Sequence, residues 1–245
     1  MIVLQDVHYS YRARKRWFRR EETVTPVLHG VNLQIEAGEM FGLVGPNGSG
    51  KTTLTKLIIG VYPPDRGEVL YQNSRPNLSN GNWSEKIGLV SGAATRLFAT
   101  VDLHEHIVLY KNLYRTFDSV WFERQLEEFQ IQDKLHKRPT MISFGERTKF
   151  ELALTLACCP EVLILDEPTV GLDPMAISLV RNAIKAYLKA KGGCGILTSH
   201  NLKDITEICE RGGFLQQGIV SDFFTSQNVN SELLEDRFRE VYGSG

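Results

Sequence analysis

The hydrophobic residues of this chain form two kinds of pattern. In the first, short and almost wholly apolar runs stand between polar stretches, which is typical of strands buried on both faces of a parallel sheet. These runs cover residues 40–44, 87–90, 162–165 and 195–199. Residues 31–36 differ, because apolar and polar side chains alternate there and predict a strand with one solvated face. Residues 1–9 and 68–72 are predicted as further strands, the first of them at a sheet edge.

The second pattern has the spacing of an amphipathic helix. Between residues 102 and 137, large apolar residues recur every three or four positions, namely Leu103, Ile107, Tyr110, Tyr114 and Phe117. Another helix is expected after Asp173, its predicted N-cap, with Pro174 in the first turn. A hairpin around Gly218 and a terminal helix within 226–245 complete the chain. Together the patterns predict an α/β fold with a helical insertion at 102–137 between its two halves.

Composition narrows the classes of protein. The 245 residues, 42% hydrophobic and 23% charged, suffice for one large soluble domain or two small ones. A formal net charge of −1 provides no field that would attract nucleic acid, so no nucleic-acid partner is predicted. No apolar run is long enough to cross a bilayer, and the N-terminus has no secretory pattern. The four cysteines lack C-x-x-C spacing and are expected to be reduced core residues of a cytoplasmic protein.

One strongly basic run covers residues 12–20. It has two interpretations. It could contact lipid headgroups or an acidic partner surface. It could also be the solvated tip of a hairpin, balanced by Glu21 and Glu22, which is the commoner situation for a run of charges.

The motif with the clearest chemistry follows the apolar run 40–44. It has the pattern G-x-x-x-x-G-K-[ST] of a phosphate-binding loop and precedes a predicted helix. In such a loop, backbone N–H groups face the phosphates, the lysine reaches the β- and γ-phosphates, and the final hydroxyl binds Mg²⁺. The alternative is a glycine-rich turn that binds nothing. The predicted nucleotide-binding residues here are Gly45, Pro46, Asn47, Gly48, Ser49, Gly50, Lys51, Thr52 and Thr53.

Two carboxylates follow the apolar run 162–165. Open α/β sheets bind ligands at the carboxyl ends of their strands, where Asp166 and Glu167 stand. One carboxylate can hold Mg²⁺ through a water molecule, and a second can accept a proton from an attacking water. The alternative is a strand that ends in charges because it has reached solvent.

Four further motifs make the interpretation specific. Residues 142–147 (Ile-Ser-Phe-Gly-Glu-Arg) resemble the signature loop of ATP-binding cassette (ABC) proteins, and residues 163–169 (Leu-Ile-Leu-Asp-Glu-Pro-Thr) resemble their second nucleotide motif. Residues 171–174 resemble the loop that follows, and 197–200 the segment that ends in the switch histidine. The order is that of the family. The resemblance implies one ABC ATPase domain over 1–245, with a mostly parallel core sheet, an antiparallel β subdomain, a helical subdomain at about 92–147, and no extra C-terminal domain.

The resemblance also implies a role for individual residues. ATP and Mg²⁺ are the implied cofactors, with Thr52 and Asp166 at the metal. Glu167 resembles the general base, and His200 resembles the residue that contacts the γ-phosphate and orients Glu167 and water. Tyr11 resembles the aromatic residue that stacks on adenine, although Trp17 or Phe18 could take that place.

The signature residues imply a partner. Ser143, the Gly145 N–H and Glu146 stand where the family closes on the γ-phosphate bound to a second ATPase subunit. Gly145 also lies at the start of a predicted helix, and the N-terminus of a helix favours an anion. One chain would therefore carry two half-sites, which become complete sites in a homodimer or a paired cassette.

Two departures from the family pattern stand out. Ala93 occupies the position at which the family usually has a glutamine that touches Mg²⁺ and water and senses the membrane subunit, so this coupling does not carry over by resemblance. In the signature, Phe144 replaces the usual first glycine and Glu146 the usual glutamine. A carboxylate there either weakens anion binding or points away. ATP hydrolysis is still expected, because the phosphate motifs are intact.

The sequence thus predicts an ATPase subunit at the cytoplasmic face of a membrane, which it contacts through a separate transmembrane permease. Export is favoured over import, because the basic run and the region of Ala93 resemble export branches of the family. The alternative is a soluble ABC ATPase that acts on ribosomes or DNA. Such proteins usually have two fused cassettes or a long coiled coil, which this chain lacks. A P-loop kinase or small GTPase would leave the signature loop and His200 unexplained.

Overall fold

A computed structural model describes residues 1–14, 22–79, 81–92 and 95–243. Most of the basic run, including Trp17 and Phe18, lies outside the described residues, and so does Ala93. The two interpretations of the basic run and the hypothesis about Ala93 therefore stay predictions.

The core is a six-stranded sheet in the order β5-β6-β7-β3-β8-β9. Its first five strands run parallel, and β9 pairs with β8 in the antiparallel direction around Gly218, as predicted. The strands are β3 (Met40–Val44), β5 (Ile87–Ser91), β6 (Val162–Asp166), β7 (Cys194–Thr198), β8 (Arg211–Gln216) and β9 (Ile219–Thr225).

Both faces of the core sheet are covered, which explains the apolar runs of the sequence. In β6, Val162 and Ile164 belong to a cluster with residues of β1, β2 and α1 (Lys51–Ile58), whereas Leu163 and Leu165 pack with residues of the helices on the opposite face. All four side chains are 0% exposed. A strand with this environment cannot alternate between apolar and polar residues.

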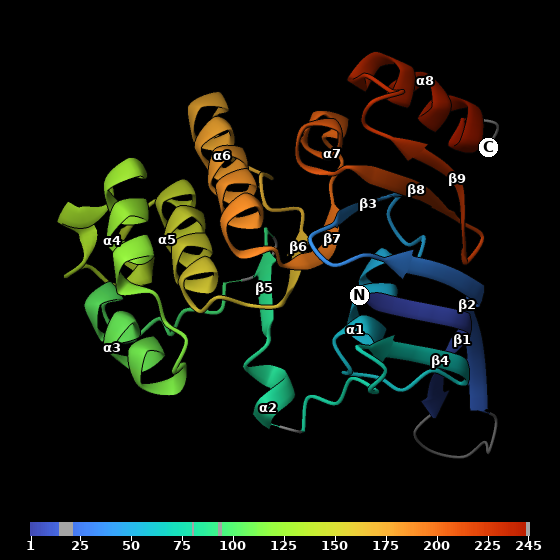
Figure 1. Cartoon of the computed structure of the whole chain (residues 1–245), viewed down its shortest axis with the longest axis horizontal. Coiled ribbons are helices and arrows are strands. Elements are labelled where there is room, and N and C mark those ends of the chain that lie inside the picture. Colours follow the sequence, from blue (N-terminus) through green and yellow to red (C-terminus); the bar gives the residue numbers. More distant parts are fainter. Residues whose placement is uncertain (15–21, 80, 93–94, 244–245) are drawn as a thin grey trace.

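A second, antiparallel sheet has the order β2-β1-β4 and lies beside α1 (Figure 1). It is formed by β1 (Ile2–Arg14), β2 (Glu22–Ile35) and β4 (Arg66–Tyr71). The prediction of an edge strand at the N-terminus is wrong, because β1 lies in the middle, where Leu4 pairs with Leu33 on one side and Val69 on the other. Pairing of strands distant in sequence decides this position, and the local pattern of β1 does not contain it.

The helical insertion projects from the core on the side away from the small sheet (Figure 1). It contains α3 (Leu103–Leu113) and α4 (Ser119–Glu128), followed by the 3₁₀ turns η1 (Gln132–Lys134) and η2 (Pro139–Met141), and leads into α5 (Phe144–Ala157). Phe122 and Phe129, almost fully buried, pack with Phe150 of α5 in one cluster. The aromatic residues of this region are therefore packing residues, as their helical spacing indicated.

Two long helices and two short ones complete the structure: α2 (Gly81–Ser84), α6 (Pro174–Lys191), α7 (Leu202–Ile208) and α8 (Ser231–Tyr242). As predicted, Asp173 caps α6 through its side chain, which accepts from the N–H groups of Met175 and Ala176. Helix α7 was not predicted. In the described part of the chain, no helix has both the length and the apolar character needed to cross a membrane.

Candidate nucleotide-binding site

The predicted phosphate loop connects β3 to α1. Its last glycine, Gly50, has φ of +108°, and a Cβ there would lie 3.0 Å from Val27 Cγ1. Only glycine adopts this backbone without strain, and here it also leaves room for the neighbouring strand. Helix α1 starts at the next residue, Lys51, so the N–H groups of its first turn, which have no partner within the helix, point toward the loop.

Lys51 lies in the loop with only 8% of its surface exposed. Its ammonium donates hydrogen bonds to the carbonyls of Gly45, at 2.6 Å, and Pro46, at 3.0 Å. Burial lowers the pKa of Lys51, and the carboxylates of Glu167 and Asp166 act against this shift. A partly desolvated cation is thus placed where phosphate oxygens could take the place of these carbonyls as its partners.

Asp166 ends β6, and Thr198 ends the neighbouring strand β7. The Thr198 hydroxyl donates to Asp166 Oδ1 at 2.5 Å, which fixes one carboxylate oxygen and leaves the other side of the group toward the cavity. Asp166 and Thr52 line this cavity together. Carboxylate and hydroxyl oxygens suit Mg²⁺, which usually takes few protein ligands and completes its shell with phosphate oxygens and water.

Glu167 has φ of +54°, in the left-handed region that a glutamate seldom adopts. Its N–H donates to the Thr198 carbonyl at 2.9 Å, which holds the turn against β7. The opposite side is closed by Gly92, where a Cβ would lie 2.1 Å from the Glu167 carbonyl oxygen. A strained backbone held from both sides directs the Glu167 side chain into one position.

His200 contacts the Glu167 carboxylate through its backbone and through its ring. Its backbone N–H donates to Glu167 Oε2 at 2.9 Å, and its ring Nε2 lies 3.3 Å from Oε1. The Glu167 side chain is 17% exposed and that of His200 is 49% exposed, so the pair has one face toward solvent. The carboxylate can therefore accept a proton from a water in the cavity while His200 keeps it oriented.

A cavity of about 340 Å³ brings these groups together. Its lining comprises Tyr11, Val27, Asn47, Gly48, Gly50, Lys51, Thr52, Thr53, Asp166, Glu167 and His200. The sequence motifs predicted every one of these residues as part of the site except Val27, which comes from β2 and belongs to none of the motifs. Tyr11 stands at the margin of the cavity, 38% exposed, with its hydroxyl 3.1 Å from Thr53 Oγ1.

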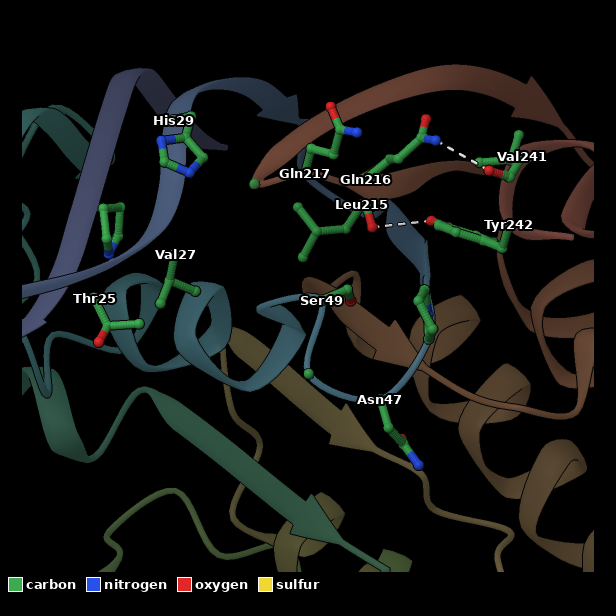
Figure 2. A pocket seen from close by; sticks show the side chains of 14 residues that line it. Thr25, Val27, His29, Asn47, Ser49, Leu215, Gln216, Gln217, Val241 and Tyr242 are labelled. Carbon is green, nitrogen blue, oxygen red and sulfur yellow. Dashed lines mark hydrogen bonds between the residues drawn. The ribbon is translucent and has the colours of Figure 1, made fainter. Parts of the chain in front are cut away.

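Three loop residues lie elsewhere. Gly45 contributes the carbonyl beneath Lys51, whereas Pro46 and Ser49 line a second cavity of about 680 Å³ on the side of β8 and α8 (Figure 2). There the Tyr242 hydroxyl donates to the Leu215 carbonyl at 2.9 Å. The residues that line this larger cavity include no carboxylate and no lysine, so it lacks the groups that phosphate chemistry requires.

The signature residues stand apart from the cavity, at the start of α5. Ser143 Oγ accepts from the Glu146 N–H at 3.2 Å, and the Ser143 N–H donates to Glu146 Oε2 at 2.8 Å. This capping box places the Glu146 carboxylate on its own helix terminus. The hydrogen bond from the Ser143 N–H lowers the pKa of Glu146, so the group stays ionised.

In the described ranges, no three or more His, Cys, Asp and Glu side chains gather in a way that could hold a metal by themselves. The oxygen pair of Thr52 and Asp166 beside the phosphate loop is the arrangement that fits Mg²⁺ bound together with a nucleotide. The fold and this cavity define a P-loop nucleotide-binding protein.

Comparison with known proteins gives the family. Residues 28–170 match the model of the ABC transporter family. The chain is 31% identical over 216 residues to the uncharacterized ABC transporter ATP-binding protein YhcH of Bacillus subtilis, covering 86% of this chain and 68% of that protein. It is 30% identical over 250 residues to the lipopolysaccharide export system ATP-binding protein LptB of Acidithiobacillus ferridurans, covering 99% and 96%. The chain therefore belongs to the ABC transporter family, as an ATP-binding ATPase subunit.

Solved structures of ABC transporter cassettes have the same fold as this chain. The structure of an ATP-binding subunit of an ABC transporter has a TM-score of 0.77 at 27% identity, covering 99% of this chain and 93% of that one. The dimeric structure of MJ0796, a bacterial ABC transporter cassette, has a TM-score of 0.79 at 24% identity, covering 94% of this chain and 100% of that one, and shows the shared fold. The predicted ABC ATPase fold is thus confirmed.

Proposed function

We propose that this chain hydrolyses Mg²⁺-bound ATP in a site completed by a second ATPase subunit, and that it drives export through a separate transmembrane permease at the cytoplasmic face of the membrane. The observation that supports this most directly is the 340 Å³ cavity, in which Lys51, Asp166, Glu167 and His200 meet. The surroundings of each of these four residues favour the role proposed for it below.

In this proposal the phosphate loop and Lys51 bind the β- and γ-phosphates. Thr52 and Asp166 would hold Mg²⁺, which would neutralise charge on the phosphates. Glu167 accepts the proton of the attacking water, and His200 holds Glu167 and contacts the γ-phosphate. The part-buried position of the Glu167 carboxylate, with Oε2 held by the His200 N–H, supports its role, because a base needs a fixed orientation before it needs a particular pKa.

The need for a second subunit is inferred from the residues that line the cavity, because the signature residues are not among them. Ser143 and Gly145 do not line it, although the start of α5 offers N–H groups and a favourable dipole to an anion. Two copies arranged head to tail would place each signature against the partner's phosphate loop and complete two equal sites. MJ0796, the bacterial cassette that shares this fold, is dimeric in its solved structure.

Transport, and export in particular, is supported by the relatives. Besides LptB, the linearmycin resistance ATP-binding protein LnrL of Bacillus subtilis is 28% identical over 222 residues, covering 89% of this chain and 71% of that protein. The name of LptB includes export, which agrees with the direction expected from the sequence. The alternative, a soluble ABC ATPase acting on ribosomes or DNA, has no counterpart among these relatives.

Two measurements on the purified chain test the proposal. ATP hydrolysis should require Mg²⁺ and should be lost in Glu167→Gln, while nucleotide binding stays. From solubilised membranes, the tagged chain should recover an integral membrane protein whose reconstitution with the chain raises the ATPase rate. Recovery of ribosomes or DNA with a stimulated rate would contradict the transport function and support the alternative.

A further inference from the structure

One buried carboxylate outside the cavity connects the two segments that carry Glu167 and His200. Asp204 lies in α7 and is 0% exposed. Its Oδ2 accepts hydrogen bonds from the hydroxyls of Ser199, at 2.7 Å, and Thr169. Ser199 immediately precedes His200, and Thr169 follows Glu167 by two residues. A single oxygen atom thus joins both segments behind the site.

The other oxygen of Asp204 binds a cation from a third element. Arg181 of α6 donates from Nε to Asp204 Oδ1 at 2.7 Å, and its terminal nitrogen lies 2.5 Å from the same atom. Arg181 is itself buried, and a further nitrogen of its guanidinium contacts Glu207 Oε1 at 3.1 Å. Both carboxylate oxygens of Asp204 are therefore used by protein donors.

An ion pair at this depth is not an efficient way to stabilise a fold. Desolvation of the two charges offsets much of their attraction, and apolar side chains of similar volume often stabilise at least as well. A fully satisfied polar network instead holds its members in one arrangement. Here the members that gain a fixed position are the segments with Glu167 and His200.

We infer that Asp204 is a positioning residue for ATP hydrolysis, which acts through Thr169 and Ser199 to hold Glu167 and His200 at their observed separation. This inference rests on the proposed role of Glu167 as the base. The backbone of Glu167 is strained, with φ of +54°, and needs support to stay in place. Loss of the network would let the base move relative to its water, and misplacement by about 1 Å can lower a rate by about 100-fold.

The test uses changes that remove hydroxyls and leave the ion pair intact. Asp204→Asn would leave the buried Arg181 with only the part-exposed Glu207 as its counter-charge and could unfold the chain, so the informative variant is Thr169→Val combined with Ser199→Ala. Thr169→Ser with wild-type Ser199 serves as the conservative variant, because it retains the hydroxyl. Tyr187→Phe is the matched control, since it removes a hydroxyl that is fully buried and donates to the Pro160 carbonyl at 2.7 Å.

The expected results distinguish a loss of the positions of Glu167 and His200 from a loss of protein stability. The double variant should lose about tenfold or more in kcat with little change in KM or in the Kd for ATP. Thr169→Ser should keep most of the wild-type kcat. Tyr187→Phe should lower the melting temperature and leave kcat within about twofold of wild type. A double variant with wild-type kcat would overturn the inference, and so would an equal loss of kcat in Tyr187→Phe.

A Glu167→Gln variant measured alongside distinguishes the two levels of failure. If Glu167→Gln is inactive and the double variant is fully active, the inference fails and the proposed function stands. If Glu167→Gln hydrolyses ATP at the wild-type rate, the role of Glu167 fails and the inference fails with it.

Discussion

The phosphate-loop region and the signature region differ in how much of a site each contains. The first combines a loop, two strand ends and a histidine around one cavity, and its lysine and base are largely buried. The second is the start of α5, where Ser143 is exposed and the capping box uses the N–H groups of Ser143 and Glu146. Strand ends and loops at the edge of a parallel sheet enclose a cavity, whereas the N-terminus of a helix offers N–H donors without enclosing one. This difference agrees with the proposal that the signature acts against a second subunit.

The largest effect is expected from Glu167, the proposed general base in the phosphate-loop cavity. Glu167→Gln removes the proton acceptor and keeps the shape of the side chain, so kcat should fall by about 10²- to 10⁴-fold while the Kd for ATP changes little. Steady-state hydrolysis and nucleotide titration measure the two quantities. Glu127→Gln, at an exposed position of α4, is the matched control and should behave as wild type. A fully active Glu167→Gln would show that the cavity does not supply the base.

Lys51→Ala should act on binding. The partly desolvated ammonium would bond the phosphates of bound ATP, and a charge-assisted hydrogen bond is worth about 1.5–3 kcal/mol, so the Kd for ATP should rise by about 10- to 150-fold. Calorimetric titration of ATP into the variant measures this. Unchanged affinity would mean that the loop N–H groups carry the phosphate interaction without the lysine.

Glu146→Gln tests the signature region. The depressed pKa keeps Glu146 ionised at neutral pH, which places a negative charge where the γ-phosphate of the partner would approach. Glutamine retains an oxygen for the Ser143 N–H and removes the charge. Dimerisation with ATP should then strengthen by about 0.3–1 kcal/mol, or roughly two- to fivefold. Light scattering over a concentration series in the Glu167→Gln background measures it, and a weaker dimer would contradict the assigned repulsion.

The smallest functional effect is expected behind the phosphate loop. The Tyr242 hydroxyl donates to the Leu215 carbonyl (Figure 2). It also lies 3.4 Å from the carbonyl of Val44, the residue before the loop. Tyr242→Phe should reduce the free energy of unfolding by about 1 kcal/mol. The Kd for ATP should stay unchanged, because β3 is held by β7 and β8 on both sides. A large loss of ATP affinity would show that α8 sets the loop geometry.

The sequence predicted those features that depend on local patterns. Apolar runs identified the parallel strands, the spacing of glycines and Lys51 identified the loop, and Asp173 before Pro174 identified a helix start, because each of these signals is complete within a few residues. Residue order along strands also placed Asp166 and His200 at the same sheet edge.

Long-range features were beyond the sequence. The central position of β1 depends on its pairing with β4, whose residues lie more than fifty positions away along the chain. The sequence also left open whether the Glu146 carboxylate weakens anion binding or points away, and did not contain its hydrogen bond from the Ser143 N–H. Asp204 gave no signal at all, since one aspartate in a short helix is usually exposed. Its importance appears only when α6, α7 and the two loops meet around it.

The separation of the site between two chains is tested most directly by mixing two inactive variants. At an ATP concentration well below its raised Kd, Lys51→Ala leaves its own phosphate loop largely empty, and Gly145→Asp places a carboxylate at the signature, where a Cβ meets only Leu172 at 3.5 Å. Each should be inactive alone. Mixed in equal amounts, half of the dimers would contain one intact site of two, so the rate should recover to about a quarter of wild type.

The control replaces Gly145→Asp in the mixture by the chain with both substitutions, which cannot form an intact site with Lys51→Ala and should stay inactive. Recovery in the first mixture and none in the control is the result that the composite site predicts. A first mixture as inactive as its components, under conditions in which light scattering shows mixed dimers, would contradict the assignment of the signature to the partner's ATP.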